Sequence, residues 1–187
     1  YVISGDGAAA ETPLQPDVEI QASLGGQLEL LGHSLRPDQV IDLTTQSDEI
    51  TIAQDLYWQA TQPVDRDYTL FVHLMDEQNQ RVAGYDTQPL NGHYPTTRWQ
   101  VNEVVIQNMD LILPAGTAPG DYRLVSGMYD LQTGERLRRD IASFEPASDQ
   151  LLCHRFVISP GRGPRLNLTD RLTGGGSPWE EHAPADS

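Results

Sequence analysis

The stretch YDTQPLNGHYPTTRW, residues 85–99, combines aromatic and polar side chains in a way that suits a sugar ligand. A sugar ring stacks on flat aromatic or guanidinium groups, and its hydroxyl groups need hydrogen-bonding partners beside them. The candidate stacking groups are Tyr94, Arg98 and Trp99. The candidate hydrogen-bonding groups are Asp86, Asn91 and His93. We therefore predict that this loop binds a ligand through these six residues.

A second interpretation of the same loop is structural. Large aromatic side chains in loops commonly cap the core of a β-sandwich. In that case Trp99 plugs one end of the fold and Arg98 pairs with an acidic residue. The sequence leaves both interpretations open.

The histidines and the single cysteine show no metal-binding pattern. His73 and His93 flank one predicted strand and loop, but neither an HxH nor an HExxH motif is present. Cys153 and His154 are neighbours in a predicted strand, where adjacent side chains point to opposite faces. One cysteine also excludes an intramolecular disulfide. We predict no transition-metal site and no cofactor.

Calcium is the cation that the acidic turns suit best. Oxygen ligands of the kind that calcium prefers are found at Asp65, Asp67, Asp76, Glu77 and Asn79. Such side chains more commonly bond to the backbone of their own turn, and no stretch matches the EF-hand loop. A structural role is the preferred interpretation, with calcium as an alternative.

No catalytic arrangement is evident. Hydrolysis by paired carboxylates needs two acids that flank a bond in a cleft, and no such pair stands out. Asp55 and Glu103 are expected to be exposed acids on the polar face of a sheet. Ser126, in VSGM, lacks the GxSxG context of a nucleophile elbow. We predict no catalytic residue and no enzyme activity.

Three arginines form one basic cluster, at Arg136, Arg138 and Arg139. The cluster suits an anionic group, such as a lipid-linked phosphate, or a neighbouring domain. Alternatively, the arginines balance nearby acids on a solvated edge strand, where charge opposes edge-to-edge aggregation.

The elements that must position these groups are predicted to be β-strands, because apolar and polar residues alternate with a period of two. The alternation is clearest at 48–60, 68–76 and 121–130. Weaker strands are predicted at 17–23, 27–34, 80–86, 103–113, 135–139 and 151–158. About nine strands at this spacing indicate an all-β fold, an antiparallel β-sandwich of the jelly-roll or immunoglobulin-like type. No substantial helix is expected, only single turns near 36–40 and 146–150.

The ends of the chain differ in composition from its middle. Residues 1–16 are predicted to be a flexible linker, residues 17–158 the β-sandwich domain, and residues 159–187 a flexible tail rich in glycine and proline. Because the chain begins at Tyr1 rather than at a methionine, we expect it to be a processed or excised piece of something longer.

The charge balance excludes several classes of function. The 187 residues include 12 basic and 27 acidic side chains, for a formal net charge of −15. This charge argues against binding to nucleic acids and to anionic lipid headgroups. All the basic residues are arginines, which removes Schiff-base lysines and a P-loop lysine. No run of about 18 apolar residues is present, so we predict neither membrane insertion of this segment nor a signal peptide within it.

The central part of the chain, roughly residues 26–140, resembles a known family. The matching pieces are YW at 57–58, DYTLFVHLMD at 67–76, YPTTRW at 94–99, NEVV at 102–105 and GDYRLVSGMYDLQTGERL at 120–137. Together they resemble the extracytoplasmic β-sandwich domain that follows the transmembrane part of bacterial polytopic, glycosyltransferase-like proteins, which are related to the dolichyl-phosphate-mannose protein mannosyltransferases. The catalytic acids of such transferases lie in membrane-proximal loops that this segment does not include. The resemblance therefore implies a location outside the cytoplasmic membrane and an accessory role.

We accordingly expect a non-catalytic, extracytoplasmic accessory domain of a membrane-anchored, glycosyltransferase-like protein, tethered to the membrane by sequence beyond this chain. Its expected partner is the transmembrane region of the same polypeptide or a glycan. Two alternatives stay open: a free-standing carbohydrate-binding module, and a purely structural, immunoglobulin-like spacer.

Overall fold

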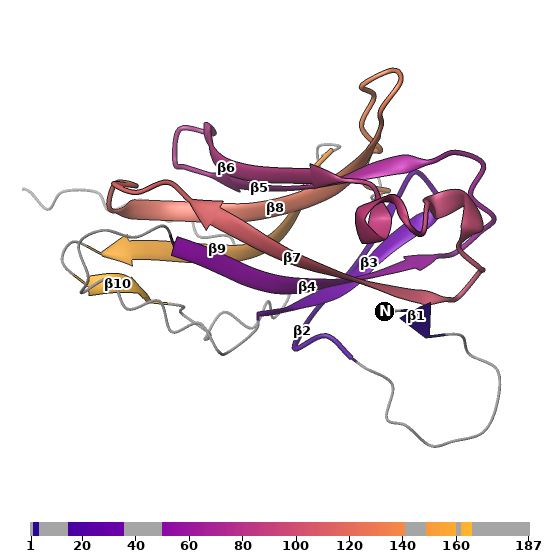
Figure 1. Ribbon diagram of the computed structural model, residues 1–187, viewed down its shortest axis with the longest axis horizontal. Helices are drawn as coiled ribbons and strands as arrows, with labels where there is room; N and C mark the ends of the chain where they lie inside the picture. The colour runs from indigo at the N-terminus through magenta and orange to yellow at the C-terminus, as the bar shows by residue number, and fades with distance from the viewer. Residues whose placement is uncertain (1, 4–14, 36–49, 141–148, 160–161, 166–187) are drawn as a thin grey trace, which may run out of the picture.

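The computed structural model describes residues 2–3, 15–35, 50–140, 149–159 and 162–165, which form two antiparallel sheets packed face to face (Figure 1). The first sheet has the strand order β1–β7–β4–β3–β2, with bounds Val2–Ile3, Val104–Leu113, Ile50–Ala60, Leu28–Leu35 and Val18–Leu24. The second sheet has the order β10–β9–β8–β5–β6, with bounds Arg162–Arg165, Leu151–Ser159, Gly120–Asp130, Tyr68–Met75 and Arg81–Thr87. The predicted all-β sandwich is confirmed.

Eight strands have seven residues or more, whereas the sequence predicted about nine. The short strands β1 and β10 lie within the segments predicted to be linker and tail. The described residues contain no α-helix, only the 3₁₀ turns η1 (Pro89–Gly92) and η2 (Thr96–Arg98). The turn predicted near 36–40, and most of the one near 146–150, lie outside the described residues.

The predicted strand at 135–139 is wrong, because this segment passes from one sheet to the other. Arg136 forms an isolated bridge with Tyr129 of β8 in the second sheet. Three residues later, Arg139 forms a bridge with Leu24 of β2 in the first sheet. Leu137 between two arginines gives the segment only a weak strand-like pattern, and its backbone hydrogen bonds are divided between two sheets. It therefore links the layers instead of extending either one.

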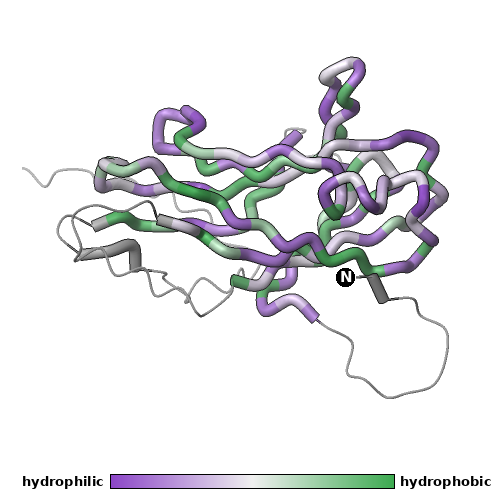
Figure 2. The backbone as a smooth tube through the Cα atoms, viewed as in Figure 1, coloured by the Kyte–Doolittle hydropathy of each residue, from purple (hydrophilic) through white to green (hydrophobic). Residues whose placement is uncertain are grey.

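The core lies between the two sheets, where most of the inward-facing positions of each strand are apolar. Figure 2 shows hydrophobic residues recurring along the strands of both layers. The largest fully buried side chains are Trp58, Phe71, Leu24, Leu28, Leu30, Leu56, Leu70, Leu74, Leu111, Leu113, Leu124 and Met128. Burial of each aliphatic side chain of this size contributes about 1.5–3 kcal/mol to folding.

Strand β5 is buried at every position, on both of its faces. On its outer face, Phe71 has no exposed surface because the Arg136 guanidinium lies over its ring, with Cζ 4.4 Å from the ring centroid. Below the ring, Gly127 of the neighbouring strand β8 leaves the space that Phe71 occupies: a Cβ at this position would lie 2.6 Å from the Phe71 ring. Arg136 and Gly127 are thus closely packed around Phe71 on the outer face of the second sheet.

Candidate functional site

The structure places Trp99 inside the sandwich. Only 5% of its surface is exposed, it belongs to the core between the sheets, and its Nε1 donates a hydrogen bond to the Tyr94 carbonyl at 3.0 Å. It is therefore positioned as the structural interpretation expects, as a plug at the end of the fold, and it offers no exposed face for a sugar. Arg98 is exposed, and no ion pair joins it to another described residue.

Glu103 is buried, which corrects the expectation of an exposed acid. Its side chain is 3% exposed, and Oε2 accepts hydrogen bonds from the Tyr94 hydroxyl at 2.9 Å and from the Gln100 backbone at 2.8 Å. Burial and the neighbouring Glu103 carboxylate raise the pKa of the Tyr94 phenol. Glu103 and Tyr94 therefore hold the loop together from within.

Asn91 and His93 are exposed members of the same loop. Asn91 and its neighbour Leu90 both have left-handed backbone conformations, with φ of 56° and 50°. The Leu90 backbone N–H donates to Oε1 of buried Gln107 at 2.7 Å, which holds this unusual turn in place. Asn91 Oδ1 accepts a hydrogen bond from the Tyr85 hydroxyl at 3.2 Å.

Asp86 belongs to another cluster, on the outer face of the second sheet. Its carboxylate lies 2.9 Å from His73 Nε2, 3.3 Å from the Tyr129 hydroxyl and 3.6 Å from Arg81 Nη2. Burial lowers the pKa of His73, although its hydrogen bond to Asp86 opposes this shift. Neutral His73 therefore donates its Nε2–H to Asp86. The structure thus separates the six predicted residues: Trp99 is a buried plug, Tyr94 bonds to Glu103, Asn91, His93 and Arg98 are exposed in the loop, and Asp86 belongs to this cluster.

The residues considered for metal binding have structural contacts. Asp67 Oδ1 accepts hydrogen bonds from the backbone and hydroxyl of Thr97, and Asp76 Oδ1 accepts one from the Gln80 backbone at 2.7 Å. Cys153 is buried, which raises the pKa of its thiol to about 12. Across the described ranges, no three His, Cys, Asp or Glu side chains are grouped so that they could hold a metal ion.

A cleft of about 340 Å³, which the sequence did not predict, lies at the junction of several chain segments. These segments are the β2–β3 turn, the β4–β5 connection, the start of β5, the end of β8 and the crossing segment after it. The cleft is lined by Gln27, Asp65, Arg66, Tyr68, Asp130, Glu135, Arg136, Leu137 and Arg138. Apart from Leu137, every one of these side chains carries a hydrogen-bonding group.

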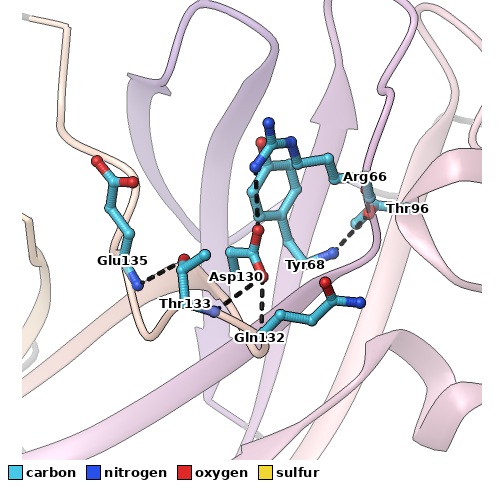
Figure 3. A network of polar contacts seen from close by, with 7 residues as sticks. All are labelled: Arg66, Tyr68, Thr96, Asp130, Gln132, Thr133 and Glu135. Carbon is cyan, nitrogen blue, oxygen red and sulfur yellow. Dashed lines mark hydrogen bonds and ion pairs between the residues drawn. The ribbon is translucent and has the colours of Figure 1, made fainter.

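An ion pair at the cleft joins the connection just before β5 to the end of β8. Arg66 Nη1 lies 3.1 Å from Asp130 Oδ2, as Figure 3 shows. The other carboxylate oxygen, Oδ1, accepts hydrogen bonds from the backbone N–H groups of Gln132 at 2.8 Å and Thr133 at 3.4 Å. These backbone hydrogen bonds, together with Arg66, lower the pKa of Asp130. Asp130 therefore stays ionised and acts as an acceptor.

Thr96 connects the predicted loop to the wall of the cleft. Its side chain is completely buried, and its hydroxyl accepts a hydrogen bond from the Tyr68 backbone at 3.0 Å and donates one to the Arg66 carbonyl at 2.6 Å (Figure 3). Both partners line the cleft. The loop at 85–99 thus positions cleft residues instead of supplying them.

Tyr68 lies among the acids of the cleft. It is 6% exposed, and its pKa is raised by burial and by the charges of Asp65, Asp130 and Glu135, while Arg66 opposes the shift. The phenol therefore stays protonated and offers a donor beside these carboxylates.

Two local features of the sequence pointed toward this cleft. The turn DLQTGE at 130–135 and the arginine cluster that follows it both supply lining residues. No local feature of the sequence indicated that Gln27, Asp65 and Arg66 would line a common cleft. They come from positions distant in the chain, and only the packing of the two sheets brings them beside Arg138.

Comparisons with known proteins do not identify a family. No family model matches the chain, and no curated protein matches it. Among solved structures, the chain is similar to a β-glucuronidase from glycoside hydrolase family 2, with 12% sequence identity and a TM-score of 0.39. The match covers 52% of this chain and 9% of that one. A likeness at this level says nothing about the ligand or activity of this chain.

Among the residues that the structure describes, there is no apolar helix of membrane-spanning length.

Proposed function

We propose that this chain is a non-catalytic accessory domain of an extracytoplasmic, membrane-anchored, glycosyltransferase-like protein, and that it contacts glycan. The sequence resemblance of residues 26–140 supports the location and the accessory role. The β-sandwich fold, in which the described strands are packed around a single core, is consistent with a stable binding or spacing unit.

The observation that carries the proposal is the chemistry of the Arg66–Asp130 cleft. A glycosidase needs one carboxylic acid that keeps its proton until it transfers it to the leaving group. Asp130 does not fit this acid role, because backbone donors and Arg66 stabilise its charged form. Charged groups that are already paired with each other suit the binding of a polar partner better than proton transfer.

The same cleft also fits a free-standing carbohydrate-binding module, which differs from the first proposal only in its tether. A ligand-free spacer has no need of a cleft with so many hydrogen-bonding groups. We therefore rank the spacer last.

Two measurements test the proposal. The purified chain is assayed for hydrolysis of glycosides and esters, and we expect no turnover above the buffer rate. Turnover that Asp130→Asn abolishes would make the chain an enzyme and overturn the proposal.

In cells that express the parent gene, the protein is followed by fractionation and by protease digestion of intact cells or spheroplasts. We expect it in the membrane fraction and accessible to protease from outside. Recovery in the medium or the soluble periplasm would favour the free-standing module, and a soluble cytoplasmic pool would contradict both.

A further inference from the structure

We infer that the cleft lined by Gln27, Arg66, Asp130, Glu135 and Arg138 is the glycan-binding site, and that it selects neutral, polyhydroxylated saccharides over anionic ones. This inference rests on the proposed function and gives it a site and a ligand class.

Two of the three charged side chains that remain exposed to a ligand in the cleft are acids. The cleft has three arginines and three acids, and Arg66 and Asp130 already form an ion pair at 3.1 Å. Arg136 is engaged by the Phe71 ring and lies 3.4 Å from Asp149, which is outside the cleft lining. The charged side chains that remain exposed are the basic Arg138 and the acidic Asp65 and Glu135.

An anionic ligand meets repulsion in this setting, because it would approach two exposed carboxylates and a chain with a net charge of −15. A neutral saccharide avoids this penalty. Each sugar hydroxyl donates and accepts hydrogen bonds, so it matches a lining in which guanidinium groups only donate and carboxylates only accept.

Gln27 supplies an acceptor that no other described residue uses. Its Oε1 is shielded from solvent and has no hydrogen-bond partner, although the residue lines the cleft. A buried acceptor without a partner carries an uncompensated desolvation cost, so turning the Gln27 amide toward the cleft to accept from a ligand hydroxyl relieves that cost. The backbone of Gln27 is held separately, since its carbonyl accepts from the Thr61 N–H at 2.8 Å.

The cleft is fixed before a ligand arrives. Thr96 holds the backbone of Arg66 and Tyr68. On the other wall, the Arg138 carbonyl accepts from the Gly25 N–H at 2.9 Å, which ties the crossing segment to the first sheet. A site whose walls are already ordered loses less entropy on binding. Its volume of about 340 Å³ is near the lower end for ligand sites, which suits a short saccharide.

The test is calorimetric titration of the full chain with two matched disaccharides, one neutral and one with a carboxylate. We expect the neutral disaccharide to bind more tightly, with an affinity that changes less than about twofold between low salt and about 0.5 M salt, because the ligand carries no charge to be screened. Preferential binding of the carboxylate disaccharide, with strong weakening by salt, would overturn the inference. Silence of the folded protein toward both, and toward a wider panel of neutral oligosaccharides, would overturn it as well.

Variants locate the binding. Arg138→Ala and Glu135→Gln change exposed side chains, so we expect the fold and its melting temperature to be retained and affinity to fall tenfold or more. Arg98→Ala is the matched control, because this exposed arginine lies in the 85–99 loop and does not line the cleft. If Arg98→Ala loses binding while Arg138→Ala keeps it, the site is in the loop and the inference is wrong.

Gln27→Leu separates a binding role from a structural one. It removes an acceptor that has no partner, so we expect stability to be unchanged or higher while affinity falls. A loss of stability with unchanged affinity would contradict the role given to Gln27. If these binding tests fail, the proposed accessory role is not affected. The proposed function is overturned instead by enzymatic turnover or by a cytoplasmic location of the protein, even if the cleft binds a sugar.

Discussion

His33 of the first sheet and His154 of the second meet edge to face, with ring centroids 5.5 Å apart and ring planes at 77°. His33 has no exposed surface. Protonation of His33 would therefore place a charge inside the core and beside a second imidazole. Burial is the main cause that lowers the pKa of His33 to about 4, and the field of His154 adds to it, while the Cys153 backbone and Asp17 oppose the shift.

This contact predicts that the protein loses stability in mild acid. Between a pH of about 6.5 and a pH of about 4, the unfolded chain binds a proton at His33 that the folded chain does not bind. The free energy of unfolding therefore falls as pH decreases through this range, by on the order of 3 kcal/mol in total, and His33 contributes no slope above it. Urea unfolding at a series of pH values measures this slope.

The matched variant is His33→Leu, which replaces the imidazole by an apolar side chain of similar size that cannot titrate. We expect it to flatten the slope without removing it, because burial also lowers the pKa of His73 and gives a contribution of the same sign. An unchanged slope in His33→Leu would show that the buried imidazole does not cause the acid sensitivity.

Thr96→Val tests whether the loop supports the cleft. The valine keeps the shape of the side chain but leaves the Tyr68 N–H and the Arg66 carbonyl without their partner. We expect a loss of about 1–3 kcal/mol in unfolding free energy, with weaker saccharide binding because Arg66 is less well held. Thr97→Val removes an exposed hydrogen bond and should cost less. Equal stability of the Thr96→Val variant and the parent would argue against this role.

Trp99→Ala distinguishes the two interpretations of the aromatic loop. Because Trp99 is buried in the core, we expect a loss of about 3–5 kcal/mol in unfolding free energy, measured by denaturant titration. Trp99→Phe should keep more of the stability, since it fills most of the same space. A Trp99→Ala protein that is as stable as the parent and fails only in sugar binding would support the interpretation of Trp99 as a stacking platform.

Gly127→Ala tests the packing around Phe71. The added Cβ would lie 2.6 Å from the Phe71 ring, so we expect a loss of about 1–3 kcal/mol from overpacking. Combining it with Phe71→Leu should cost less than the sum of the two single changes, because the smaller side chain makes room for the methyl group. Additive costs in this double-mutant cycle would show that the two positions do not compete for space.

The fold was largely predictable from local pattern. In β5, Leu70, Val72 and Leu74 alternate with residues of the outer face, and this alternation is the direct consequence of a strand with one face on a core. The error at 135–139 shows the limit of the same argument. Periodicity reports which way side chains point, but it does not report which sheet receives the backbone hydrogen bonds.

The positions of the predicted site residues could not be derived from local pattern, for a related reason. Trp99 and Arg98 are neighbours in a loop that is rich in functional groups, yet one is buried and the other exposed. The residue type indicates that the Trp99 ring packs against another surface, and either a sugar or the protein core can provide that surface. Packing at the end of the sandwich decided in favour of the core.

By itself, the sequence determined the all-β class, the position of eight strands and the acidic surface, because alternation, turn residues and charge are properties of neighbouring positions. Only the tertiary structure decided that Arg66 pairs with Asp130, that His33 faces His154 and that a polar cleft forms beside Arg138. These partners are selected by how two twisted sheets pack and by where one segment crosses between them. Such long-range contacts leave no mark in the local pattern of the chain.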